Sequence, residues 1–375
     1  MNAEPLLPDT LHDEQAMQDF VRDFRRYLRL DVMPGAHQVF EQVVRPNFER
    51  ENGRDFKDYH EVRRAMTKNG YYQFWSAMQR RSQELMWEAV IEPTERELDK
   101  LIDRFRTLAK DKPAGGSLSL DDTLEIPRYH TAVDIHIQPG GYHTEFVPDD
   151  ITSGSLYLGG LPIYIDGEMG PESDGIGRAL LGWLEFHEPD FTPTAILDMG
   201  CAVGNSTLPW ARTFPGAELH AIDVAAPCLR FAHARAEAKG VAVHFSQQNA
   251  ENTRFEGERF DLIISHIMLH ETSRPALKNI LAETHRLLKP GGLMLHLDVP
   301  RGTSKFEQFM SQWETYNNNE TFSSYMTDVD LPALAVSVGF DKSRVKMAGA
   351  APGQEGVKHS YVESGFAWPV LVGRK

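Results

Sequence analysis

The chain has 375 residues, of which 41% are hydrophobic and 25% charged, a composition typical of a folded globular protein. Its formal net charge of −15 would repel a phosphate backbone, so we expect no nucleic-acid partner. Cys201 and Cys228 are too few for a disulfide framework or a cysteine-rich zinc site. We also expect no membrane span and no secretory signal, and therefore a cytoplasmic protein.

Residues 1–111 carry apolar side chains at helical spacing and lack the alternation that is typical of strands. Phe20, Phe24, Tyr27 and Leu28, for example, recur at positions i, i+4, i+7 and i+8. This spacing places them on one face of a helix. The region therefore predicts four or five amphipathic helices.

The next region, residues 112–173, opens with a linker that contains proline and glycine. Alternating residues follow over 132–137, and a Pro-Gly-Gly turn follows them at 139–141. This pattern predicts short strands, so we expect a β-rich connecting segment. Over residues 174–375 the pattern changes to helix and strand in short succession, which is typical of a parallel sheet with helices on both faces.

Residues 195–207 hold the most informative motif of the chain. An apolar strand runs into a turn of small residues, in which Gly200, Ala202 and Gly204 would let the backbone approach a ligand closely. The first amide groups of the helix that follows point at the same place. Asp223 ends the next predicted strand, where a carboxylate suits the two hydroxyls of a ribose.

Two families of nucleotide-binding domain share this arrangement. Dinucleotide-binding domains need a third glycine three residues after the second, but Thr207 stands at that position. The spacing Asp198-x-Gly200-x-Ala202-x-Gly204 instead resembles the first motif of class I S-adenosylmethionine-dependent methyltransferases.

The resemblance extends over residues 174–375 and implies the family's fold. We therefore expect an α/β protein with a Rossmann-like seven-stranded methyltransferase sheet and helices on both of its faces. The α-helical N-terminal region and the short β-rich segment would precede this sheet. Later residues of the chain match further elements of the family: 245–251 its adenine-contacting turn and 260–266 its fourth strand. Residues 343–347 and 367–372 match its closing antiparallel hairpin, with a glycine-rich elaboration at 348–364.

The cofactor that the resemblance implies is S-adenosyl-L-methionine. An acidic residue at the end of the first strand suits this cofactor, because its methionine end carries an ammonium and a sulfonium. The implied cofactor-binding residues are Asp198, Gly200, Cys201, Ala202, Gly204, Asn205, Asp223, Val224, Asn249, Ala250, Ser265 and His266.

The implied function is methyl transfer to a small-molecule acceptor, with the oxygen of a hydroxyl or carboxylate as the favoured atom. Positioning the acceptor close to the methyl group supplies much of the rate, and a base is needed where a hydroxyl must lose its proton. His270 followed by Glu271 resembles the catalytic pair of small-molecule O-methyltransferases. We therefore take His270 as the base and Glu271 as the carboxylate that orients it.

The regions before the cofactor fold are expected to build the acceptor pocket. The cluster of His130, His136 and His143 with Glu145 lacks the spacing of metal ligands on one helix face, so we predict no metal. The helical region would form a lid, part of the pocket or a homodimer interface. The candidate substrate-binding residues are Tyr142, His143, Tyr157 and Tyr164.

Several alternatives stay open at this point. Methylation of a protein, or of nitrogen or carbon in a small molecule, uses the same fold, and a non-catalytic scaffold could keep the cofactor site. Amino-methylation of nucleic acid is disfavoured further, because residues 265–268 are Ser-His-Ile-Met rather than an Asp/Asn-Pro-Pro-aromatic tetrapeptide.

Overall fold

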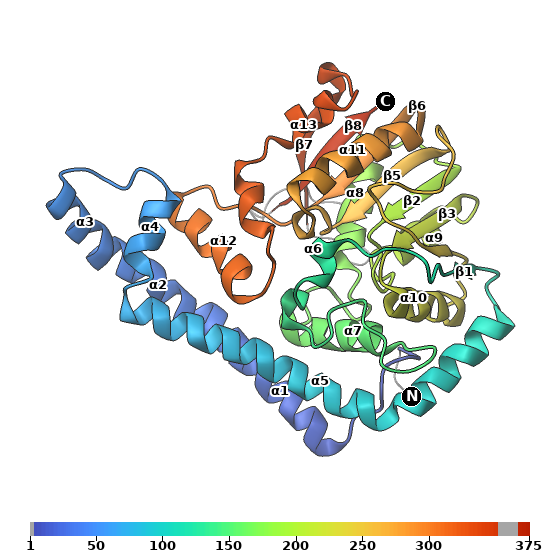
Figure 1. Cartoon of the computed structure of the whole chain (residues 1–375), viewed down its shortest axis with the longest axis horizontal. Coiled ribbons are helices and arrows are strands. Elements are labelled where there is room, and N and C mark those ends of the chain that lie inside the picture. The colour runs from blue at the N-terminus through green and yellow to red at the C-terminus, as the bar shows by residue number, and fades with distance from the viewer. Residues whose placement is uncertain (1–3, 352–366) are drawn as a thin grey trace.

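A computed structural model describes residues 4–351 and 367–375 and shows a mixed sheet beside a long helical arm (Figure 1). The sheet has eight strands in the order β1-β4-β3-β2-β5-β6-β8-β7. β1 to β6 pair in parallel, whereas β8 pairs antiparallel with both β6 and β7. The strands are β1 (Ser117–Ser119), β2 (Ala195–Met199), β3 (Glu218–Asp223), β4 (His244–Gln247), β5 (Phe260–His266), β6 (Leu288–Leu297), β7 (Val345–Ala350) and β8 (Trp368–Arg374).

The predicted parallel sheet and its closing antiparallel hairpin are confirmed. The strand count was wrong by one: seven strands were predicted, and β1 is an eighth at the edge beside β4. A three-residue strand that lies far from its partner in the sequence leaves too little periodicity to be predicted. Most of the elaboration predicted at 348–364 falls outside the described residues.

The central strands are apolar along their length because helices cover both faces of the sheet. Within β2, Ile196 packs in the layer of α8, α9 and α10, whereas Leu197, on the opposite face, packs in the layer of α11 and α13. Helices on both faces are thus confirmed. Their bounds are α8 (Gly175–His187), α9 (Leu208–Thr213), α10 (Ala226–Ala238), α11 (Arg274–Leu287) and α13 (Leu331–Ser337).

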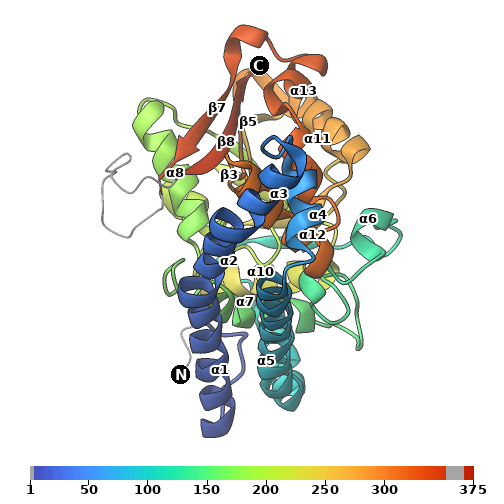
Figure 2. The same cartoon turned by 90° about the vertical axis from the view of Figure 1, so that its left-hand side faces the viewer.

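The N-terminal region is helical, as predicted, and extends along one side of the sheet domain (Figures 1 and 2). α1 and α5 lie side by side in this arm. The apolar stripe of α1 is only partly covered, since Phe20 and Tyr27 are 58% and 55% exposed. The helical elements are α1 (His12–Tyr27), η1 (Leu28–Val32), α2 (Met33–Val39), η2 (Phe40–Val44), α3 (Arg45–Asn52), α4 (Tyr59–Met66) and α5 (Gly70–Asp111).

α12 (Lys305–Asn317) joins the arm to the sheet domain. It follows β6 in the sequence but packs among the N-terminal helices, where Phe306 stacks on Phe40 with ring centroids 4.8 Å apart. Trp313 packs against Trp75 with the rings tilted and their centroids 5.8 Å apart. Because these aromatic side chains bury large areas, the arm is held against the sheet domain. Within the described ranges, no helix is long and apolar enough to span a bilayer.

The β-rich segment predicted for residues 112–173 was wrong. Apart from β1, its regular elements are helical, and the alternation at 132–137 does not form a strand. His136 and Ile137 there have positive φ angles of 54° and 50°, which are incompatible with an extended chain. The elements are α6 (Arg128–Thr131), the helical turn η3 (Ile135–Ile137) and α7 (Thr152–Tyr164).

Close packing against two other helices explains why α7 contains glycines. A Cβ at Gly154 would lie 2.4 Å from the Cβ of Phe231 on α10, and one at Gly160 would lie 3.2 Å from the Trp87 ring on α5. The glycines lower helix propensity, but they let three helices approach closely. The close approach places α7 over the end of the sheet.

A buried ion pair fastens the N-terminal end of the described chain to α10. Both carboxylate oxygens of Glu4 accept hydrogen bonds of 2.8 Å from Arg235, which is 1% exposed. Glu4→Ala leaves this guanidinium buried without a carboxylate, with only the carbonyl of Glu172 as a partner, and we expect it to lower the free energy of unfolding by about 3–5 kcal/mol. Urea denaturation measures the loss. Glu258→Ala, which breaks only an exposed pair with Lys375, should change stability little; equal losses would contradict the prediction.

Candidate active site

A cavity of about 490 Å³ lies at the carboxyl ends of the parallel strands. The loops after β2, β3 and β5 form one side of it, and Trp87 of α5, Tyr157 of α7 and Glu314 of α12 form the other. Ligands bind at this edge in open α/β sheets, because the loops from neighbouring strands meet there. The helical arm and the segment that follows it therefore close the cavity over the sheet.

The glycine-rich loop is held by the end of β3. The backbone amides of Gly200 and Cys201 both donate to the carbonyl of Ile222. The amide of Ala202, a residue with a positive φ of 44°, donates to Asp223 Oδ2 at 2.9 Å. Asp223 also accepts the amide of Ala225 through Oδ1 at 2.9 Å. Each of its oxygens keeps a further lone pair for a ligand.

Glycine is required at position 200. Its φ is +73°, and a Cβ there would lie 2.4 Å from Cγ of Met268, a residue that also lines the cavity. We expect Gly200→Ala to lower the melting temperature and to weaken binding of S-adenosylmethionine, measured by calorimetry, because the loop or Met268 must move. Gly53 is a matched control: its φ is +67°, but nothing lies within 4 Å of a Cβ. Gly53→Ala should add only backbone strain, and equal cofactor affinity in both variants would contradict the prediction.

Asp198 presents an unpaired oxygen at the cavity. The side chain is 1% exposed, and its Oδ2 accepts a 2.6 Å hydrogen bond from Thr207. Its Oδ1 has no hydrogen-bond partner and lies 3.5 Å from Nδ1 of His266, which is also unpaired. Buried carboxylate oxygens are normally paired. This oxygen is therefore suited to a cationic or hydrogen-donating ligand.

The structure brings together seven of the twelve predicted cofactor residues at this cavity, and five do not line it. Of the five, Ser265 is buried and bonds to His296 at 2.7 Å. The Asn249 side chain accepts the amide of Glu251 within its own turn. The lining residues are Asp198, Gly200, Cys201, Ala202, Asn205, Asp223 and His266, and the others are Gly204, Val224, Asn249, Ala250 and Ser265.

His270 lies in a helical turn after β5 (η4, Leu269–Glu271) and is held by Asp298 at the end of β6. Its Nδ1 lies 2.6 Å from Asp298 Oδ1, and its backbone amide donates to Asp298 Oδ2. The sequence prediction gave Glu271 the orienting role. Glu271 instead approaches the other ring nitrogen, Nε2, at 3.5 Å, and Asp298 is the carboxylate that orients the ring.

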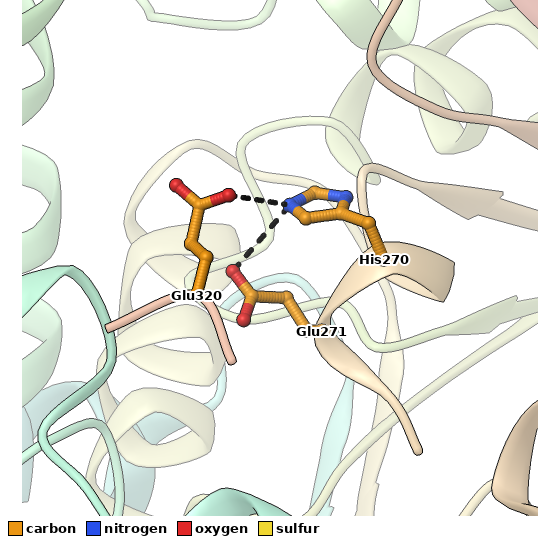
Figure 3. Close-up of side chains that lie close together, drawn as sticks. All are labelled: His270, Glu271 and Glu320. Atoms are coloured by element: carbon orange, nitrogen blue, oxygen red, sulfur yellow. Dashed lines mark ion pairs between the residues drawn. The ribbon is translucent and has the colours of Figure 1, made fainter. Parts of the chain in front are cut away.

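Glu320, which follows α12, completes this group. Its Oε2 lies 3.7 Å from Nε2 of His270, so the side chains of His270, Glu271 and Glu320 point toward one another (Figure 3). His136 lies beside both acids, with Nε2 at 3.1 Å from Glu271 and Nδ1 at 3.2 Å from Glu320. Among the described residues, the ion pairs of these two glutamates are with histidine alone.

Burial and mutual charge shift the pKa values of this cluster. Burial alone would lower the pKa of His136, but Glu320 and Glu271 outweigh it and raise the pKa to about 9. The pKa of His270 is likewise raised well above its ordinary value against the effect of burial, with Asp298 as the main charge. Burial, together with Glu320, raises the pKa of Glu314 to about 8.

Three of the four predicted substrate residues line the cavity: Tyr142, Tyr157 and Tyr164. The first two pack edge to face, with ring centroids 5.7 Å apart. His143 does not line the cavity and instead packs against His130, which does. The cavity thus has an aromatic wall opposite the cofactor loop.

Several residues that line or support the cavity were not among the predicted site residues, among them His136, Asp298, Glu314, Glu320 and Trp87. Asp298 directly follows the apolar run that forms β6, so the sequence could have indicated its place at the ligand-binding edge of the sheet. Glu314, Glu320 and Trp87 enter from distant helices and loops, and nothing in their local sequence indicates the cavity.

Comparison with known proteins identifies the domain at the cofactor loop. Residues 196–292 match the model of a methyltransferase domain. The ubiquinone biosynthesis O-methyltransferase of Cereibacter sphaeroides is 29% identical over 157 residues, 40% of this chain and 62% of that protein. The demethylmenaquinone methyltransferase of Thermus thermophilus is 32% identical over 108 residues, 29% of this chain and 48% of that protein. The chain thus spans less than two thirds of the length of both curated relatives.

Among solved structures, the chain is similar to phosphoethanolamine N-methyltransferase 2 of Haemonchus contortus in complex with S-adenosyl-L-methionine. The two share 18% sequence identity, and the match covers 52% of each chain. Its TM-score is 0.38.

Proposed function

We propose that this chain, whose residues 196–292 match a methyltransferase domain, is an S-adenosylmethionine-dependent enzyme that transfers a methyl group to an oxygen of a small molecule. The observation that carries the proposal is one continuous cavity. It joins the glycine-rich loop and Asp223 at one end to His270 and Glu271 at the other. A cofactor and an acceptor held at these two ends would meet within the same enclosed space.

The residues of the loop fit the cofactor. S-adenosylmethionine supplies a methyl group on a positively charged sulfur, beside a positively charged ammonium. The unpaired Asp198 Oδ1 is placed to accept a hydrogen bond from that ammonium. Asp223 would accept the two ribose hydroxyls, and the absence of a side chain at Gly200 would let the cofactor approach the backbone.

The lining of the cavity favours a hydroxyl acceptor over a carboxylate. Glu271, Glu314 and Glu320 line it, and within the described part of the chain no lysine or arginine does. An anionic acceptor would meet the carboxylates of Glu271 and Glu320, and the histidines that could offset this charge already pair with those carboxylates. The tyrosine wall suits a planar or apolar body that carries the hydroxyl. The O-methyltransferase name of one curated relative supports the same choice.

His270 and Glu271 are the residues that we propose act on the acceptor oxygen. A hydroxyl must lose its proton during transfer to oxygen. Nε2 of His270, the ring nitrogen away from Asp298, can accept that proton when the ring is neutral, so transfer should rise with pH through the raised pKa of His270. Asp298 fixes the ring through Nδ1, so Nε2 is held in position. The enclosing helices would keep the acceptor in line with the methyl group.

Labelled cofactor tests this function. The purified full chain is incubated with S-adenosylmethionine labelled in its methyl group and with panels of phenols, alcohols, small acids and amines. Label on a hydroxyl oxygen supports the proposal. Label on nitrogen, carbon or the protein itself would replace it with one of the alternative activities. Binding of cofactor without transfer to any panel would favour a non-catalytic scaffold.

A homodimer through the helical arm also remains a proposal. Phe20, Tyr27 and Leu30 are each more than half exposed on the first helices, and apolar side chains of this size are often covered in a complex. Light scattering on the full chain should give the mass of a dimer. A monomer at all concentrations would contradict this.

A further inference from the structure

We propose that His270, Glu271 and Glu320 bind a divalent metal ion in the cavity, and that this ion holds the acceptor oxygen. The inference rests on the proposed function, and in it Nε2 of His270 binds the ion instead of taking the acceptor proton itself. It also reverses the prediction from sequence that the chain holds no metal. The earlier prediction considered only ligands close in sequence, whereas these three residues meet in space.

The geometry of the three side chains fits a metal site. One ligand atom from each residue lies within 4.8 Å of the other two. Nε2 of His270 is 3.5 Å from Glu271 Oε1 and 3.7 Å from Glu320 Oε2. Two ligands of one tetrahedral ion, each about 2.1 Å from it, are about 3.4 Å apart. An ion therefore fits between these atoms with small movements of the side chains.

The contact between His270 and Asp298 is an independent indication. Histidines that bind metals almost always donate their other ring N–H to a carboxylate or carbonyl, which fixes the tautomer. Asp298 meets this requirement at 2.6 Å and is itself fixed by the amides of His270 and Val299. When the ring proton is on Nδ1, the lone pair of Nε2 faces two carboxylate oxygens. A metal ion between these three atoms would take the place of the proton that Nε2 otherwise carries.

The surrounding charges point the same way. Asp298, Glu271 and Glu320 bring three carboxylates into a buried region, and their ion pairs among the described residues are all with histidines. Buried carboxylates of this kind are normally paired with cations or coordinate a metal. Only His136 and His270 face these three carboxylates as ion-pair partners among the described residues, so a divalent ion where the oxygens converge would add positive charge that the region can hold.

The donor set restricts the class of ion and of acceptor. One imidazole nitrogen and two carboxylate oxygens suit Mn²⁺, Fe²⁺ or Zn²⁺, whereas Mg²⁺ and Ca²⁺ prefer oxygen alone. Three protein ligands leave positions open for the acceptor. An ion there would bind a hydroxyl and a neighbouring oxygen of one acceptor, so we expect acceptors with two adjacent oxygens, and it would lower the pKa of the hydroxyl.

The ion neither gains nor loses electrons in the methyl transfer, and the bonds formed and broken balance without it. The acceptor O–H proton passes to water, the new O–CH₃ bond forms with an oxygen lone pair, and the S–CH₃ bond breaks. Sulfur keeps that electron pair and becomes the neutral thioether. The oxidation state of the ion does not change.

Direct metal binding tests the proposal without activity. The full chain is stripped with a chelator and titrated with Mn²⁺, with bound ion followed by electron paramagnetic resonance; Zn²⁺ is measured after dialysis by mass spectrometry. We expect one ion per chain. Asp298→Asn should weaken binding by about 10–100-fold, and Glu320→Gln by at least as much. Glu218→Gln alters a Glu–His pair elsewhere in the sheet, with His220, and should bind the ion as the unaltered chain does.

The outcomes separate this inference from the proposed function. Failure of the unaltered chain to bind Mn²⁺ and Zn²⁺ would overturn the inference, as would unchanged affinity in folded Glu320→Gln. Full transfer to a hydroxyl by the chelator-treated protein would also overturn it while leaving the proposed function intact. One ion per chain, lost in Glu320→Gln, would support the site even if the cofactor failed to bind.

Discussion

Replacement of His270 by alanine is expected to lower kcat by about 10²–10⁴-fold and to leave the affinity for S-adenosylmethionine nearly unchanged. The side chain lies at the acceptor end of the cavity, 2% exposed, and its Nε2 faces the space where the acceptor hydroxyl would lie. The proposed cofactor contacts are instead those of the glycine-rich loop and Asp223. The two measurements, single-turnover transfer and calorimetry, therefore report on opposite ends of one cavity.

Controls for this substitution separate chemistry from folding. His60→Ala removes a histidine on α4 that packs against Tyr59 outside the cavity, and it should change neither quantity. Asp298→Asn weakens the contact that orients the His270 ring but keeps the ring itself, so it should lower kcat by less than His270→Ala does. A loss of cofactor affinity in His270→Ala equal to the loss in rate would show general disruption and contradict the assignment.

The sequence predicts the cofactor end of the site because its signals are local. Strand, turn and helix over residues 195–207, and the acid at Asp223, follow one another within about one βαβ unit. Once the two strands of such a unit pair in parallel, the residues in the turns at their carboxyl ends are brought close together. Gly200 and Ala202 therefore lie where the motif indicates, with positive φ angles and amides held by β3.

The acceptor end could not be predicted in the same way. His136 comes from a turn with positive φ, Glu320 from the loop after α12, and Asp298 from the end of β6. Glu320 reaches this group because α12 leaves the sheet and packs among the N-terminal helices, and long-range packing of this kind has no periodic signal in the sequence. Asp298 instead reaches His270 because β5 and β6 are neighbouring parallel strands. The prediction of Glu271 as the orienting carboxylate was wrong because it relied on adjacency in the sequence and did not consider the neighbouring strand.

Replacement of Asp223 by alanine is expected to weaken S-adenosylmethionine binding by about 10²–10⁴-fold. A hydrogen bond to a charged group contributes about 1.5–3 kcal/mol, and this carboxylate is placed to accept two from the ribose. Tenfold in affinity corresponds to about 1.4 kcal/mol, which gives the expected range. The loss of the bond from the Ala202 amide would also loosen the glycine-rich loop. Calorimetric titration of the full chain measures the change.

Asp341→Ala is the matched control for Asp223→Ala. Asp341 Oδ1 accepts the amide of Ser343 at 2.8 Å, which is the same turn contact that Asp223 Oδ1 makes with Ala225, but in a turn outside the cavity. If the cofactor affinity depended on turn stability alone, both variants would lose it equally. Asp223, unlike Asp341, lines the cavity in which we propose that the cofactor binds, so only Asp223→Ala should lose cofactor affinity. Asp223→Asn keeps one acceptor oxygen, and its cofactor affinity should lie between those of the unaltered chain and Asp223→Ala.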